Sequence, residues 1–115
     1  MFGSKRKRYN ADVRELLPRF GFDIDDAGMM KTLDSLDIAW KHGYNKYEAS
    51  LFIAWLVFAG MLQGGETRFL EIYKNIKDIQ NDWVAKGAVR SDLSGQFERK
   101  IKDKLGSLME GEGLE

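Results

Sequence analysis

Residues 49–62 read Ala-Ser-Leu-Phe-Ile-Ala-Trp-Leu-Val-Phe-Ala-Gly-Met-Leu, and this stretch contains no charged side chain. A helix that is apolar on every side is normally the centre of a bundle, because each side needs a covering neighbour. The uninterrupted apolar run is shorter than the roughly 20 residues that a membrane-spanning helix needs. The stretch therefore predicts a central buried helix over about residues 46–62.

The residues on either side of this stretch mark the ends of the helix. Asn45 is followed three positions later by Glu48, a spacing that resembles a capping box with Asn in the usual Ser or Thr position. Gly64 and Gly65 follow the apolar run, and glycine commonly follows the last turn of a helix. These signals predict both helix ends.

Four amphipathic helices are expected around the central one. The first is short, is capped by Asn10 and ends near Pro18, because proline lacks an amide hydrogen and restricts the residue before it. The second begins after Asp25 or Asp26 and ends at Gly43, the next spans about residues 67–86, and the last follows a cap at Ser91. Their apolar stripes are Val13, Leu16 and Leu17; Met29, Leu33, Leu36 and Trp40; Phe69, Ile72, Tyr73, Ile76 and Trp83; and Leu93, Phe97, Ile101, Leu105 and Leu108.

The fold class that follows is all-α, a compact single-domain bundle of four to five helices. Its expected limits are a flexible basic N-terminal arm (residues 1–9), a helical domain (residues 10–109) and a flexible C-terminal tail (residues 110–115). A chain of 115 residues has the usual size of one domain.

Composition excludes several kinds of chemistry. The chain has no cysteine, so disulfides, zinc–thiolate sites and thiol catalysis are ruled out. His42 is the only histidine, and most transition-metal sites use several His or Cys ligands. We therefore expect no metal and no cofactor. The basic start of the chain has no apolar run after it and does not resemble a secretory signal, so a cytoplasmic location is expected.

Positive charge is concentrated at the N-terminus. The formal net charge is zero, yet residues 1–20 carry six Lys or Arg and only two acids. Lys5, Arg6, Lys7 and Arg8 form the basic arm. Such a cluster can contact phosphates without reading sequence, or can contact an anionic membrane surface weakly. The alternative is a solubilising terminus without a partner.

A second candidate site is the turn between the second helix and the central one. It brings together three aromatic residues, two lysines and the histidine, namely Trp40, Lys41, His42, Tyr44, Lys46 and Tyr47. Interleaved aromatic and cationic side chains can stack on a base or anchor a protein partner. The alternative is that Trp40 and Tyr47 belong to the core while the lysines are solvated.

Catalytic residue sets are poor. Asp34 and Asp37 with His42 could perform acid–base chemistry only if they were buried, and nothing in the sequence indicates burial. Residues 23–34 fit a calcium loop badly, and the central helix is too apolar to be a DNA-recognition helix. We therefore expect a non-enzymatic module that binds a protein partner or forms a homo-oligomer. The alternative is a nucleic-acid-associated protein that uses the basic arm and the Trp40–Tyr47 turn.

Overall fold

The computed structural model describes residues 2–22, 31–65 and 67–111, and within them the side chains of residues 5–22, 31–65 and 67–103. The helices are α1 (Phe2–Leu16), α3 (Leu36–Lys41), α4 (Lys46–Gln63), α5 (Phe69–Ala85) and α6 (Ser91–Gly111), with the short 3₁₀ turns η1 (Leu17–Phe20) and η2 (Leu33–Ser35). None of these residues forms a strand. The predicted all-α bundle is confirmed.

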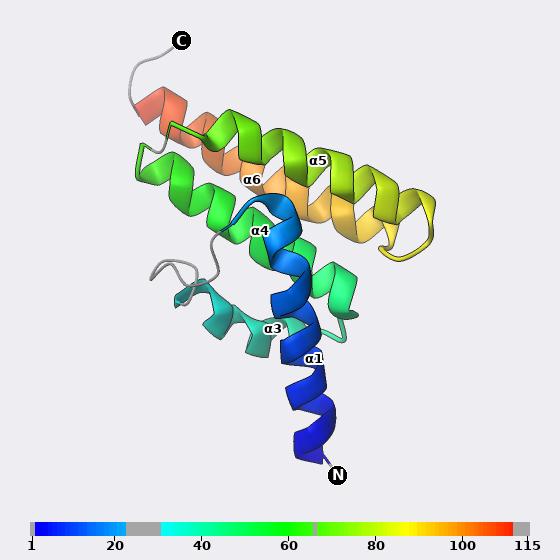
Figure 1. The fold of residues 1–115 in the computed structure, drawn as a ribbon. Coiled ribbons are helices and arrows are strands. Elements are labelled where there is room, and N and C mark those ends of the chain that lie inside the picture. The colour runs from blue at the N-terminus through cyan, green and yellow to red at the C-terminus, as the bar shows by residue number, and fades with distance from the viewer. Residues whose placement is uncertain (1, 23–30, 66, 112–115) are drawn as a thin grey trace.

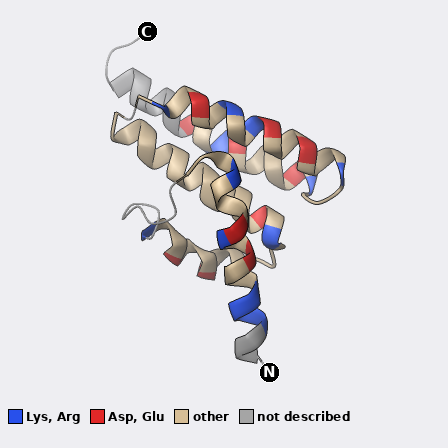
Figure 2. Cartoon of the chain, viewed as in Figure 1, with Lys and Arg blue, Asp and Glu red and all other residues tan. Residues whose placement is uncertain are grey.

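Helix α4 is the centre of the fold, as its apolar sequence predicts. It contacts α1, α3, α5 and α6. In Figure 1, α4 lies between the α5–α6 pair and α3, and α1 crosses it. The side chains it buries are Glu48, Ala49, Ser50, Leu51, Ile53, Ala54, Trp55, Phe58 and Ala59. Charge is carried mainly by the helices around α4, and most of α4 itself is uncharged (Figure 2).

The ends of α4 form as the flanking residues predict. The side-chain oxygen of Asn45 accepts a hydrogen bond of 2.8 Å from the backbone N–H of Glu48, and the carboxylate of Glu48 accepts one of 3.1 Å from the backbone N–H of Asn45. This reciprocal pair is a complete capping box. Gly43 before the helix and Gly65 after it have φ values of +73° and +71°, which side chains other than glycine rarely adopt.

Helix α1 begins earlier than predicted. It starts at Phe2, so the helix runs through the expected boundary between an arm of residues 1–9 and a domain from residue 10. Asn10 is not the cap but lies inside the helix, where its side-chain oxygen accepts a hydrogen bond from Arg6 Nε at 3.2 Å. Tyr9 and Val13 are buried one turn apart, so packing against the rest of the fold includes the basic segment. The predicted end near Pro18 is confirmed, since α1 stops at Leu16.

Leu33 and Leu36 are buried as predicted, but Trp40 at the end of α3 is not. Trp40 is 40% exposed, and Ala39 is buried in its place. Ala39 and Trp40 are about 100° apart around the helix axis, so the buried face of α3 contains Leu36 and Ala39 and leaves much of Trp40 accessible. Residues 23–30, which include the predicted start of this helix and Met29, lie outside the described residues. So do the side chains of Leu105 and Leu108.

Candidate functional site

The aromatic residues of the Trp40–Tyr47 turn do not form a single surface. Trp40, Tyr44 and Tyr47 each pack edge-to-face against a different helix. Their partners are, in that order, Tyr9 of α1, Phe97 of α6 and Trp83 of α5, with ring centroids 4.9, 5.5 and 5.2 Å apart. Tyr44 and Tyr47 are half-buried, and Trp40 is the most accessible of the three rings. The six residues predicted as one site therefore separate into three packing contacts.

The polar residues of the same turn contact their own neighbours. Lys41 Nζ lies 2.9 Å from a carboxylate oxygen of Asp37. The amine of Lys46 lies 5.3 Å from the centre of the Tyr47 ring, and the His42 ring stacks on Tyr44 at 5.4 Å. Lys41 and His42 are exposed at the surface of the bundle. The turn thus presents Lys41 as an exposed cation, and of its three aromatic rings only that of Trp40 is exposed beside it.

The four cations of the basic arm point in different directions. Successive residues of a helix are about 100° apart around its axis. Arg6 faces α3, where its guanidinium lies 5.5 Å from the centre of the Trp40 ring and 3.3 Å from Asp37. Lys5, Lys7 and Arg8 are exposed, and none of them makes an ion pair with the described residues. The exposed positive charge at the free end of α1 is visible in Figure 2.

The exposed residues Asp37, Ile38, Trp40 and Lys41, together with the half-buried Arg6 and the buried Tyr9 beneath them, make up a region that we call the α1–α3 corner. Of the three large apolar side chains that are exposed in the described part of the chain, two lie here, Ile38 at 47% and Trp40 at 40%. Helical spacing places Ile38 and Trp40 on the two sides of the Asp37–Lys41 ion pair. Ile38 and Trp40 are therefore about 160° apart around α3, with charges of both signs between them.

Tyr9 and Arg6 hold the exposed Trp40 ring in place. The Tyr9 ring packs against its edge, and the Arg6 guanidinium lies over its face. Burial raises the pKa of the Tyr9 hydroxyl to about 12, and that hydroxyl has no hydrogen-bond partner among the described residues. Trp40 is therefore a fixed ring, and ordering it on binding costs little conformational entropy.

The carboxylates that were considered for catalysis lie on the surface. Asp34, Asp37 and His42 are all exposed. Hydrogen bonds from Lys41 and then Arg6 lower the pKa of Asp37, which makes it a weaker base. Within the described ranges, no group of three or more His, Asp or Glu residues is arranged to hold a metal ion.

Sequence reasoning missed a second role of Glu48. Besides capping α4, its buried carboxylate accepts hydrogen bonds from the backbone N–H and from Nε of Arg90, at 3.1 and 2.8 Å. Burial alone would raise the pKa of Glu48, but the hydrogen bonds from Arg90 and Asn45 outweigh it and lower this pKa. The pair links the start of α4 to the segment before α6. Its role is structural, since every polar atom of the carboxylate is occupied by the fold itself.

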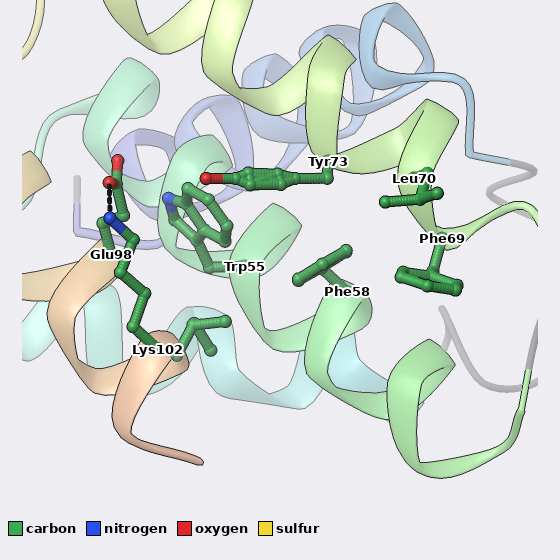
Figure 3. A pocket seen from close by; sticks show the side chains of 8 residues that line it. Trp55, Phe58, Phe69, Leu70, Tyr73, Glu98 and Lys102 are labelled. Carbon is green, nitrogen blue, oxygen red and sulfur yellow. Dashed lines mark ion pairs between the residues drawn. The ribbon is translucent and has the colours of Figure 1, made fainter. Parts of the chain in front are cut away.

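An apolar pocket of about 180 Å³ opens between α4, α5 and α6. Figure 3 shows its walls, which are formed mainly by Trp55, Phe58, Phe69, Leu70, Tyr73 and Ile101. Leu70 is 69% exposed, the highest value among the exposed large apolar residues of the described chain. Most of the other wall residues were predicted as core. The pocket arises because three apolar stripes converge here without filling the space between them.

One end of this pocket is closed by ion pairs centred on Glu98. Its carboxylate accepts hydrogen bonds from Lys77, from Gln80 at 3.0 Å and from Lys102 at 3.1 Å. Gln80 in turn accepts a hydrogen bond from the indole N–H of Trp55 at 3.0 Å. Burial would raise the pKa of Glu98, but these donors outweigh it and lower the pKa to about 2. Glu98 is therefore a fixed negative charge at neutral pH.

Comparisons with protein-family models, with curated proteins and with solved structures find no match to this chain. Across the described residues, no helix has the length and apolar character needed to cross a membrane.

Proposed function

We propose that this chain is a small non-enzymatic protein-interaction module that self-associates through the α1–α3 corner. The observation that carries the proposal is the exposed Trp40 ring, held between Tyr9 and Arg6. Trp, Tyr and Arg are the residues most enriched among those that dominate binding energy at protein interfaces. Because the ring is fixed before binding, its apolar surface can be buried without a large entropic cost.

The charges of the corner favour a second copy as the partner. A two-fold interface places the same patch on both sides, so it must be complementary to itself. The corner carries the cations Arg6 and Lys41 beside the anion Asp37, and Ile38 and Trp40 lie on either side of them. The formal net charge of zero leaves no overall repulsion between two copies.

The test is sedimentation velocity of the full chain over a range of concentrations. We expect a reversible monomer–dimer equilibrium that Ile38→Glu weakens by at least about ten-fold, which corresponds to about 1.4 kcal/mol. Leu70→Glu is the control, because it introduces the same charge at another exposed apolar position, on α5. A chain that stays monomeric at every concentration, or a dimer that only the Leu70 variant weakens, overturns the proposal.

A second candidate function is association with nucleic acid. It is favoured by one observation, that Lys5, Lys7 and Arg8 are exposed on α1 and form no ion pair within the described structure. The phosphate contribution to binding is strongest at low salt. A mobility-shift assay at low salt is therefore decisive, with a variant that carries Gln at all three positions as its control. Absence of binding at low salt, or equal binding by the variant, removes this function.

A further inference from the structure

The space between α5 and α6 contains two adjoining hollows of opposite polarity. The first is the apolar pocket described above. The second is an open polar hollow lined by Gln80, Ser94, Gly95 and Arg99. Both hollows are bordered by Glu98 and Lys102, so they meet at this ion pair. Gly95 faces open space, because no atom lies within 4 Å of the position where its side chain would begin.

The junction between the hollows carries more positive than negative charge. Lys77 and Lys102 both bond the single carboxylate of Glu98. Arg99 adds a third cation, which is exposed and makes no ion pair with described residues. The side chain of Lys102 is 63% exposed, and an ammonium group has three donors, so it can bond a second anion while it keeps its bond to Glu98.

The size of the apolar pocket limits what it can hold. An apolar protein cavity of about 150 Å³ accommodates benzene, which has six carbons. By the same ratio, a volume of about 180 Å³ suits an apolar chain or ring of roughly six to eight carbons. Apart from the Tyr73 hydroxyl, the aromatic walls have no free hydrogen-bonding group to offer, so polar groups are disfavoured in this part of the site.

We propose that the α4–α5–α6 pocket binds a medium-chain carboxylate, with its apolar chain against the pocket walls and its carboxylate at Lys102 and Arg99. The apolar chain is removed from water by the pocket walls, and the carboxylate is matched by the excess of cations at the junction. This inference is independent of the self-association proposed above, since no residue of the α1–α3 corner lines either hollow.

The indole N–H of Trp55 gives a direct signal for binding. It is hydrogen-bonded to Gln80 at the junction, and Trp55 also lines the pocket. In a ¹H–¹⁵N NMR titration of the full chain with octanoate, we expect a saturable shift of this signal. Trp40 and Trp83 do not line the pocket, so their indole N–H signals serve as internal controls.

Three further probes separate the contributions of tail and charge. Octan-1-ol has a similar tail without the charge, and we expect it to bind about ten-fold more weakly, as the loss of one charge-assisted hydrogen bond implies. Acetate has the charge without the tail, and octylammonium has the tail with the opposite charge. We expect neither to produce a saturable shift. Equal binding of octylammonium and octanoate overturns the proposal, since the junction would then not select an anion.

Variants of exposed residues test the assignment without disturbing the core. Lys102→Gln combined with Arg99→Gln should weaken octanoate about ten-fold and leave octan-1-ol unchanged. Lys100→Gln is the matched control, because Lys100 is an exposed cation on the same helix that lines neither hollow. Leu70→Ala should weaken both ligands equally. If octanoate produces no saturable shift of the Trp55 signal, or if the Lys100 variant weakens it as much as the double variant, the proposal is wrong.

Discussion

Replacement of Glu98 by Gln tests the ion pairs between α5 and α6 through the dependence of stability on pH. The folded chain holds the pKa of this carboxyl at about 2, against an ordinary value of 4.5. A group whose pKa is lowered by folding stabilises the folded state above its unfolded pKa. That stabilisation is lost as the pH falls through the folded value, so the sensitive window lies between about pH 5 and pH 2.

The magnitude follows from the size of the shift. Each pKa unit corresponds to about 1.4 kcal/mol, so a change from 4.5 to about 2 corresponds to about 3 kcal/mol. This is an upper limit, because the side chain of Glu98 is 16% exposed and solvent screens part of the interaction. A loss of about 3 kcal/mol is more than half of the total stability of a weakly stable domain, which is about 5 kcal/mol.

The assay is urea unfolding, followed by circular dichroism, at neutral pH and at several values between pH 5 and pH 2. We expect the natural chain to lose up to about 3 kcal/mol more than Glu98→Gln across this window. Part of the pH dependence should remain in the variant, because the pKa of Glu48 is also lowered by folding. Glu15→Gln is the control, since Glu15 is exposed and has no described ion pair. Equal losses in the natural chain and in Glu98→Gln would refute the reasoning.

Three further substitutions test the packing around α4. Tyr9→Phe should stabilise the fold by about 1 kcal/mol, because it removes a buried hydroxyl with no described partner, and a lower midpoint in urea would contradict this. Asn45→Ala should cost about 1 kcal/mol through loss of the capping box, whereas Asn81→Ala at an exposed position should cost less. Phe58→Ala should cost about 3–5 kcal/mol in thermal or urea unfolding, because its buried ring packs against Trp55 and Tyr73.

The sequence predicts the features that depend on local chemistry. The apolar run of α4, its capping box and the stop of α1 near Pro18 were all found where the residues indicated. Each of these depends on the conformational preference or hydrogen bonding of residues within a few positions of one another. Such effects are independent of how distant segments pack, so the sequence alone is sufficient to place them.

The start of α1 and the direction of Trp40 could not be predicted in this way. Residues before Asn10 carry no apolar stripe that marks a helix, and they are ordered by contacts between Arg6 and α3. The exposure of Trp40 depends on how much of its ring Tyr9 and Arg6 of α1 cover, which the local sequence does not specify.

The candidate sites were predicted in part. Trp40, Lys41 and Arg6 were chosen from their chemistry, and the structure places them together at one corner. Tyr44 and Tyr47 separate from them because each meets an aromatic partner on another helix. The apolar pocket could not be predicted from the sequence, since its wall residues have the same periodicity as ordinary core residues. Space that the side chains of three converging helices leave unfilled can be recognised only in the folded structure.

Native-state hydrogen exchange of the full chain tests the central claim, that α4 is the enclosed core and that binding surfaces lie on the helices around it. Backbone amides that open only when the whole chain unfolds exchange most slowly. We predict that the amides from Leu51 to Ala59 are the slowest in the protein, since α4 contacts each of the other described helices. Exchange of these amides as fast as those of α1 or α3 would contradict the account.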